Sequence, residues 1–217
     1  MTLESNKNFG GIGAVLFFVG GLSYFVQPLF LLGFGLVGAL LMLVSLNGFA
    51  DYYKEKSIFN NGLYSFVALI AGTIVPFIGF AYLYFYTSTI KNFVAVLYPG
   101  FTGDWANLPN LTVNQNFNPS DLTPFVGPIF AVLVVLWVFV FVAGFFAWRS
   151  LKVVSSKSTV GLFSTGGLML LVGALIPVFG LILMWIALLL LAIAFFQIKP
   201  QPEQPMATMT MTPPPTI

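Results

Sequence analysis

The chain has 217 residues, of which 59% are hydrophobic and only 6% are charged. Soluble domains carry about 25% charged residues, so this composition excludes an ordinary water-soluble globule and indicates a polytopic membrane protein. The sequence contains no His and no Cys, which excludes disulfides, thiolate nucleophiles, imidazole bases and the common zinc, copper, haem and iron–sulfur ligand sets. Its 8 basic side chains are too dispersed to form a nucleic-acid-binding face.

The first apolar stretch, residues 9–50, contains no charged residue. As a helix it would be about 63 Å long, which is roughly two crossings of a hydrocarbon core about 30 Å thick. Because proline cannot donate a hydrogen bond within a helix, we place the break between these two helices at Gln27 and Pro28.

A cluster of charged side chains at residues 51–61 predicts the first aqueous loop. Residues 62–90 are again free of charge and predict one long or tilted helix. Tyr82, Tyr84 and Tyr86 lie near its far end, where aromatic side chains typically mark a membrane interface.

Residues 91–124 contain several turn signals and many Asn and Thr residues, so we expect the one sizeable outer loop here. A fourth helix is predicted over residues 125–147. A basic loop follows at residues 149–160, with three cations and no acid.

Residues 161–198 are uncharged and predict two further crossings, with Pro177 and Gly180 at the tip of the hairpin. Residues 199–217 are rich in proline and predict a disordered tail. The expected fold class is therefore all-α, a polytopic integral membrane domain over residues 1–198. Its six transmembrane helices are expected at about 9–26, 28–49, 62–90, 125–147, 161–178 and 181–198.

The distribution of cations predicts the orientation. Six crossings place both termini on one side of the membrane, and the positive-inside rule assigns the side richer in Lys and Arg to the cytoplasm. With both termini cytoplasmic, Lys91 alone faces outward. The seven inward cations are Lys7, Lys54, Lys56, Arg149, Lys152, Lys157 and Lys199.

Short similarities between helices suggest a parallel internal repeat. Residues 62–65 (GLYS) resemble residues 161–164 (GLFS), and residues 72–76 (GTIVP) resemble residues 173–177 (GALIP). A duplicated hairpin and chance similarity among Gly- and Leu-rich helices explain this pattern equally well. Parallel repeats occur in some transporters, so the pattern favours a transport function only slightly.

The predicted spans offer little chemistry, because every Asp, Glu, Lys and Arg lies outside them. An ionisable residue within a membrane would be the usual sign of a functional site. Ser and Thr hydroxyls can donate to carbonyls of their own helix, and Asn47 lies near the aqueous boundary, so we expect no catalytic, cofactor-binding or metal-binding residue. The polar residues concerned are Ser23, Ser45, Asn47, Ser65, Thr73, Ser164 and Thr165.

Closely spaced glycines in the spans have two interpretations. Small residues let helix backbones approach one another, which is their commoner use in membranes. The pair Gly72 and Pro76, like Gly173 and Pro177, could instead form a kink or a hinge lining a pore. We expect packing to be the main use.

The outer loop contains one candidate modification site. Asn110 and Thr112 form an N-glycosylation sequon, so Asn110 is a candidate acceptor in a host that glycosylates. Phe101, Trp105 and Phe117 are expected to pack this loop onto the membrane surface or the helix ends.

Several segments resemble an archaeal family of multi-pass proteins known as domain of unknown function 996 (DUF996). The resemblance is carried by residues 5–13 (SNKNFGGIG), by residues 46–64 and by parts of the closing hairpin at 161–198. Its most specific element is ADYYKEKSIFNN at residues 50–61. The resemblance implies an archaeal plasma-membrane location, and no activity, cofactor or functional residue comes with it.

From the sequence we expect a non-enzymatic component of the cell membrane: an accessory subunit, a scaffold or an envelope-organising protein. Its expected partners are membrane lipid and other membrane proteins or further copies of itself, with no nucleic acid and no cofactor. The alternative is a channel or carrier for a small neutral or apolar solute. An intramembrane enzyme would have to rely on Ser, Thr or Tyr without a visible base.

Overall fold

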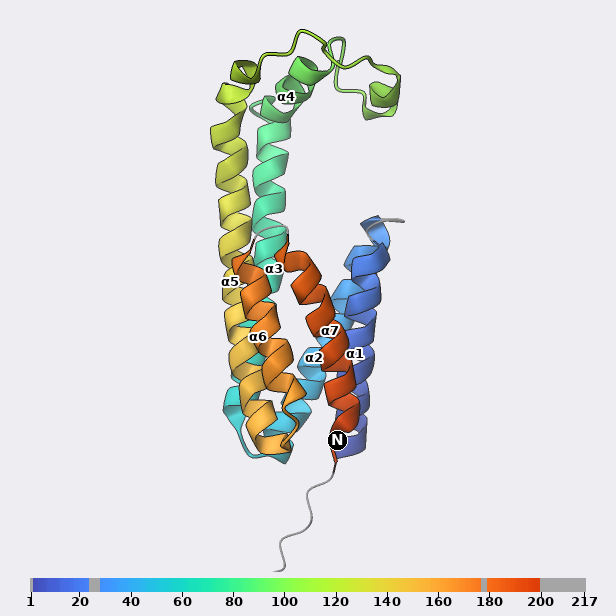
Figure 1. The fold of residues 1–217 in the computed structure, drawn as a ribbon, viewed down its shortest axis with the longest axis vertical. Helices are drawn as coiled ribbons and strands as arrows, with labels where there is room; N and C mark the ends of the chain where they lie inside the picture. Colours follow the sequence, from blue (N-terminus) through green and yellow to red (C-terminus); the bar gives the residue numbers. More distant parts are fainter. Residues whose placement is uncertain (1, 24–27, 177–178, 200–217) are drawn as a thin grey trace, which may run out of the picture.

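The computed structural model describes residues 2–23, 28–176 and 179–199, and all regular structure in these ranges is helical (Figure 1). The α-helices are α1 (Leu3–Ser23), α2 (Pro28–Tyr52), α3 (Lys56–Phe85), α4 (Thr89–Leu97), α5 (Thr123–Ser158), α6 (Leu162–Leu175) and α7 (Gly180–Gln197). Two short 3-10 helices, η1 (Trp105–Asn110) and η2 (Pro119–Leu122), lie between α4 and α5. The all-α class is thus confirmed for the described residues.

Four helical stretches are long and apolar enough to cross a membrane, which supports a membrane-embedded protein. They are Gly33–Tyr52, Lys56–Phe85, Pro119–Ser158 and Gly180–Gln197. The apolar helix α6, with 14 residues, is shorter. Over the residues that the structure describes, α1 and α6, which form two of the six predicted crossings, do not meet this criterion.

The six longer α-helices follow one another around a ring. α1 packs against α2 and α7, α2 packs against α3, α3 against α5, α5 against α6, and α6 against α7. Figure 1 shows the α2–α3 and α5–α6 connections at one end of the bundle, beside the N-terminus; we call this the basal end. At the other end, the distal end, α3 and α5 rise beyond the other helices and carry α4, η1 and η2.

The best-buried part of the molecule lies towards the basal end, where α1, α2, α3, α5, α6 and α7 all contribute side chains to one cluster. Phe49, Phe163 and Phe195 are its largest members and are fully buried. The Phe195 ring stacks on Phe49 at 6.0 Å between centroids and meets Phe163 edge-on at 4.9 Å. The cluster comprises Ala14, Leu46, Phe49, Ala50, Ile58, Leu151, Val154, Phe163, Leu191, Ala192, Ala194, Phe195 and Ile198.

Glycines bring neighbouring helices into close contact. A Cβ added to Gly72 of α3 would lie 2.7 Å from the Cβ of Phe139 on α5, and one added to Gly173 of α6 would lie 2.7 Å from the Gly180 carbonyl oxygen on α7. Such contacts leave no room for a side chain. The packing interpretation of these glycines is confirmed. α3 also continues as one helix through Pro76.

Two predicted boundaries near the aqueous loops were wrong. The expected loop at 51–61 is mostly helical, because only a short turn around Lys54 (φ 55°) separates α2 from α3. The expected end of the fourth helix at 147 was also too early, since α5 continues to Ser158 and ends where Thr159 adopts φ 60°. Charged side chains were read as helix ends, but Lys and Arg are good helix formers and continue a helix into water.

The third predicted helix, 62–90, is divided in the structure. α3 ends at Phe85 and α4 starts at Thr89, with Ser88 in the left-handed conformation (φ 53°) between them. The first helix begins at Leu3 rather than at residue 9, because polar residues also continue a helix. The sixth predicted helix, 181–198, agrees with α7 to within one residue at each end.

The remaining differences concern the outer loop, the fifth predicted helix and the predictions that fall on residues outside the described ranges. The predicted loop 91–124 contains most of α4, η1, η2 and the first turn of α5. The fifth predicted helix, 161–178, ends as α6 at Leu175. The predicted tip residue Pro177, the end of the first predicted helix after Ser23 and the tail beyond Lys199 lie outside the described residues.

Candidate functional site

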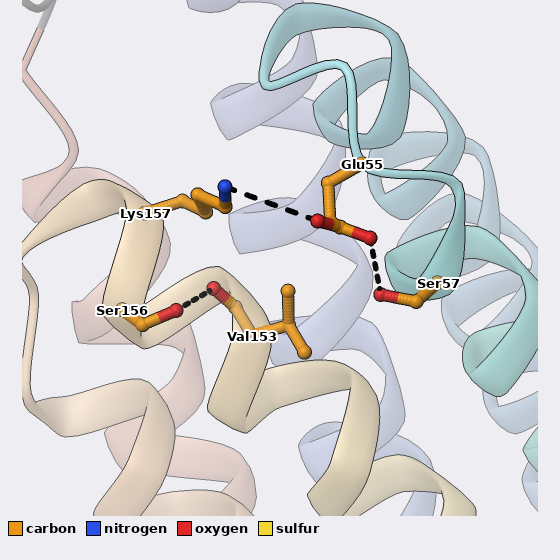
Figure 2. Close-up of polar contacts among 5 residues, drawn as sticks. All are labelled: Glu55, Ser57, Val153, Ser156 and Lys157. Carbon is orange, nitrogen blue, oxygen red and sulfur yellow. Dashed lines mark hydrogen bonds and ion pairs between the residues drawn. The ribbon is translucent and has the colours of Figure 1, made fainter.

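At the basal end, the polar side chains of Glu55, Ser57 and Lys157 connect the turn between α2 and α3 with the end of α5 (Figure 2). The Ser57 hydroxyl donates to Glu55 Oε1 at 2.8 Å, and Lys157 Nζ lies 3.8 Å from Glu55 Oε2. This ion pair joins the start of α3 to the end of α5. Both side chains are partly exposed, at 36% and 44%, so water screens the pair and its contribution to stability is below about 1 kcal/mol.

Buried serine hydroxyls form stronger links between helices. Ser150 Oγ on α5 donates to the Ile58 carbonyl at the start of α3 at 2.7 Å, and Ser45 Oγ on α2 donates to the Asn6 carbonyl on α1 at 2.7 Å. Both serines are fully buried. Ser65 of α3 similarly donates to the Ala143 carbonyl of α5 at 2.8 Å.

These bonds correct the expectation that the hydroxyls serve their own helices. That expectation holds for Thr73, which donates to Leu69, and for Thr165, which donates to Gly161. It is wrong for Ser45 and Ser65. A glycine on the partner helix brings the two backbones together, as at Gly10, where a Cβ would lie 2.5 Å from Ser45 Oγ. A carbonyl of the neighbouring helix then comes within reach.

Two buried polar atoms at the basal end have no hydrogen-bond partner among the described groups, Asn6 Oδ1 and the Tyr53 hydroxyl. The Tyr53 ring stacks on Phe49 at 6.1 Å and meets Tyr52 edge-on at 4.9 Å. Burial, with a smaller contribution from the neighbouring Tyr52, raises the pKa of Tyr53 to about 12 because the charged phenolate is poorly solvated there. Tyr53 therefore stays neutral and cannot act as a base near neutral pH.

Cations lie over aromatic rings at both ends of the α3–α5 pair. Arg149 stands 5.8 Å from the Phe145 ring centroid, and Lys152 Nζ stands 5.1 Å from that of Trp148. At the distal end, Lys91 Nζ lies 4.8 Å above the Tyr84 ring. Pairs of this kind are typical of membrane interfaces, where an aromatic side chain meets both water and lipid.

Two tryptophans donate across helices to backbone carbonyls. Trp137 Nε1 on α5 donates to Ala174 O at 2.9 Å, one residue before the end of α6. Trp185 Nε1 on α7 donates to Phe18 O on α1 at 2.9 Å. The Ala174 carbonyl is one of the last four of its helix, which have no partner within the helix, so Trp137 supplies a donor where one is needed. Sequence reasoning missed both contacts, because nothing in the sequence shows which carbonyl faces an indole.

The distal loop, which comprises the residues between α4 and α5, packs onto a helix end through its aromatic side chains, as predicted. Trp105 Nε1 donates to the Tyr84 hydroxyl at 3.1 Å, and its ring meets Phe101 edge-on at 5.0 Å, so the loop packs onto the end of α3. Phe117 is partly buried. The candidate acceptor Asn110 is exposed at the end of η1, and its Nδ2 donates to Asn107 Oδ1 at 3.1 Å.

In the part of the chain that the structure describes, the hydroxyls of Ser45, Ser65, Thr73 and Thr165 each donate to a backbone carbonyl. Two open hollows lie at the basal end of the described chain. Residues 50, 51, 54 and 56 line one hollow, while residues 7, 159–161 and 196–199 line the other. Over the ranges 2–23, 28–176 and 179–199, no group of three acidic side chains is placed to hold a metal ion.

The apolar helices, with charged and aromatic residues at the ends of the α3–α5 pair, define a helical membrane protein. The chain belongs to the family described as "Protein of unknown function (DUF996)", whose sequence model matches residues 34–195. This match confirms the family indicated by the resemblance and includes residues 46–64, but it leaves out residues 5–13. No curated protein and no solved structure matches the chain.

Proposed function

We propose that this protein is a non-enzymatic structural component of the cell membrane, an accessory subunit, scaffold or envelope-organising protein. In this proposal six helices are embedded in the membrane, and both chain ends face the cytoplasm. One observation carries the proposal: large aromatic side chains fill the basal interior of the helix ring, where Phe195 packs against both Phe49 and Phe163 and all three are fully buried.

The charges support a cytoplasmic basal end. The cations beside the α2–α3 turn, at the end of α5 and after α7 belong to the basal part of the bundle, whereas Lys91 lies on α4 at the distal end. The positive-inside rule favours the orientation that places the larger group in the cytoplasm. The same cations would attract anionic lipid headgroups, each contributing about 1 kcal/mol near the surface.

The contacts between helices also favour a structural role. Glycines and serine hydroxyls join α1 to α2 and α3 to α5, and the two indole donors join α5 to α6 and α7 to α1. Packing and interhelical hydrogen bonds of these kinds stabilise one arrangement of helices in a membrane. A rigid bundle of this kind suits a protein that positions others.

The alternative is a channel or carrier for a small neutral or apolar solute. It is supported by the order of the helix contacts, which follow one another around a ring. A ring of six helices could surround a path. The aromatic layer of Phe49, Phe163 and Phe195 stands across such a path at the basal end, so transport would require these rings to move. For this reason we favour the structural role.

Gentle solubilisation of the protein from its own membrane, followed by mass spectrometry, tests the proposal. We expect a membrane protein to be recovered with it at fixed stoichiometry. A second purification after disruption of the bundle, using Gly38→Leu at the α1–α2 contact, is the control and should lose that companion. Recovery of the chain alone, together with solute flux in liposomes, would contradict the structural role and support transport.

A further inference from the structure

We propose that a hollow between α1, the α5–α6 turn and the end of α7 binds the phosphate headgroup of one anionic phospholipid of the cytoplasmic leaflet. Residues 7, 159–161 and 196–199 line this hollow, which we call the α1–α7 hollow. The inference rests on the membrane embedding and the cytoplasmic basal end of the proposed function. It deepens that function by assigning one lipid to one place on the bundle.

The α1–α7 hollow lies where three segments distant in the sequence meet at the basal end (Figure 1). α1 contributes Lys7, the turn between α5 and α6 contributes residues 159–161, and the end of α7 contributes residues 196–199. The hollow has a volume of about 570 Å³, and ligand pockets commonly measure about 300–1,000 Å³. It is therefore large enough for a phosphate headgroup, and it opens at the surface, where a lipid can reach it.

The charges of the α1–α7 hollow suit an anion. Lys7 and Lys199 line it, and no described Asp or Glu does. Lys199 is exposed and forms no ion pair with another described residue. The Gln197 side chain, which is also exposed there, offers a neutral N–H donor. Two ammonium groups and an amide are donors that bind phosphate oxygens in proteins, so the hollow matches a phosphate in charge and in hydrogen bonding.

Glu4 competes for one of these cations. Lys7 Nζ lies 2.8 Å from Glu4 Oε1, but the Glu4 side chain is 74% exposed, whereas that of Lys7 is 20% exposed. Water screens an exposed pair of this kind and weakens it. The Lys7 ammonium also has three N–H donors, so it can bind a phosphate oxygen while it keeps the carboxylate. The pair therefore reduces the attraction of Lys7 for a phosphate without removing it.

An apolar surface begins at the same hollow. Phe196 lines it and is 50% exposed, and a Cβ added to Gly11 of α1 would lie 2.5 Å from the Phe196 ring. Because Lys7 and Gly11 are one helical turn apart on the same face of α1, the Lys7 and Phe196 side chains adjoin along the seam between α1 and α7.

Exposed apolar side chains continue from this seam along both helices. They are Ile12, Val15 and Val19 on α1, and Ile186, Leu189 and Ile193 on α7. Acyl chains cover surfaces of this kind in a membrane. A cationic hollow that is continuous with an apolar surface fits an amphipathic anion, whereas a free phosphate would use the hollow alone. We therefore assign the site to a phospholipid.

The second basal hollow provides a matched comparison. Residues 50, 51, 54 and 56 line it, and its volume is about 310 Å³. It also has two cations, Lys54 and Lys56, but the Asp51 carboxylate lies among them. All four residues belong to the one connection between α2 and α3. A general attraction between cations and anionic lipid would act at both hollows, whereas a specific site predicts binding at the α1–α7 hollow.

Native mass spectrometry of the full chain in detergent tests the proposal, with phosphatidylglycerol as the anionic lipid and phosphatidylcholine as the zwitterionic one. We expect one phosphatidylglycerol to bind more tightly than phosphatidylcholine. The double variant Lys7→Gln, Lys199→Gln should bind it about tenfold more weakly, because two partly screened cations are lost. The control Lys54→Gln, Lys56→Gln removes the same charge and should change the affinity by less than about twofold, because Asp51 already offsets part of it.

Three results would overturn the proposal. Equal affinity of the wild type and the Lys7→Gln, Lys199→Gln variant would mean that the hollow holds no headgroup. Equal weakening in both double variants would mean that the lipid is attracted by surface charge in general. Displacement of the lipid by an equal concentration of inorganic phosphate would mean that the hollow binds a soluble anion instead.

A second variant covers the case in which Lys7→Gln disturbs folding, as judged by elution volume and helix content. Lys199→Gln alone changes a residue beyond the end of α7 at Gln197. It should still weaken phosphatidylglycerol binding, and an unchanged affinity would count against the site. None of these affinities depends on recovering a protein companion, so the lipid site and the proposed structural role can fail separately.

Discussion

Gly13 and Gly38 bring α1 and α2 into direct backbone contact. A Cβ on Gly13 would lie 2.7 Å from the Gly38 carbonyl oxygen, and a Cβ on Gly38 would lie 2.6 Å from the Gly13 carbonyl oxygen. The obstacle in both directions is backbone, which cannot rotate away as a flexible side chain would. This reciprocal contact fixes how closely the first hairpin closes.

Gly38→Ala is expected to destabilise the protein by about 1–3 kcal/mol, because the added methyl group forces the two helices apart. Gly33→Ala, on the same helix, is the matched control. A Cβ there has no neighbour within 4 Å, and Ala is a better helix former than Gly. The midpoint of unfolding in mixed detergent measures both; equal midpoints for the two variants would contradict the contact.

Ser150→Ala removes the buried hydroxyl that joins α5 to the Ile58 carbonyl. We expect a loss of about 1 kcal/mol in the free energy of unfolding, as for a typical buried hydrogen bond. Thr73→Val is the control, because its hydroxyl bonds only within α3 and is exposed. A change for Thr73→Val as large as that for Ser150→Ala would show that interhelical bonding has no special role.

Trp137→Phe retains an aromatic ring but removes the donor to the Ala174 carbonyl. Because no water is available in the lipid core to replace the bond, we expect a loss of about 1–2 kcal/mol and faster proteolysis near the α6–α7 tip. Trp148→Phe, which changes an indole at the basal interface, should have a smaller effect. Equal proteolysis rates for the two variants would argue that the α6 end has other partners.

Tyr53 is expected to ionise at about pH 12 in the folded protein, above the value near 10 of an unfolded chain. The folded state holds this proton more tightly, so the stabilisation is fully present below about pH 10 and is lost as the pH rises to about 12. The difference in ultraviolet phenolate absorbance between wild type and Tyr53→Phe isolates this group. A transition near pH 10 in that difference would refute the burial argument.

The proposed orientation predicts which cysteines react in intact cells. An impermeant maleimide should label Asn110→Cys in the distal loop and leave Ser57→Cys and Ser156→Cys unlabelled until the cells are opened. Asn110 and Ser156 are exposed, and Ser57 lies at the start of α3 beside Glu55. Reaction at 57 or 156 in intact cells would reverse the orientation.

The helix bounds show how far hydropathy alone can locate structure. It found α7 to within one residue at each end, because both ends of that apolar run coincide with the helix ends. It misplaced the ends of α3 and α5, where helix continues through charged residues at Lys56 and from Arg149 to Ser158. The preference of side chains for lipid or water determines where an apolar run ends, whereas backbone hydrogen bonding determines where a helix ends. The two boundaries therefore need not coincide.

The candidate contacts were less accessible to sequence reasoning. Gly13, Gly38, Gly72 and Gly173 were correctly interpreted as packing residues, whereas Gly33 has no neighbour within 4 Å, and the partners of the packed glycines could not be named from the sequence. The donors Ser45 and Trp137 bond to carbonyls far away in the sequence, on Asn6 and Ala174. These helices are apolar on nearly every side, so no amphipathic face indicates which neighbour each one meets.

The sequence by itself determined the all-helical membrane class, the family and the unequal distribution of cations, because composition and charge are local properties that need no knowledge of contacts. Only the tertiary structure decided the order of helices around the ring, the aromatic layer at Phe49, Phe163 and Phe195, and the level at which α6 ends beside Trp137. Those features depend on the close packing of segments distant in the chain, where a glycine or a single donor determines which surfaces can meet.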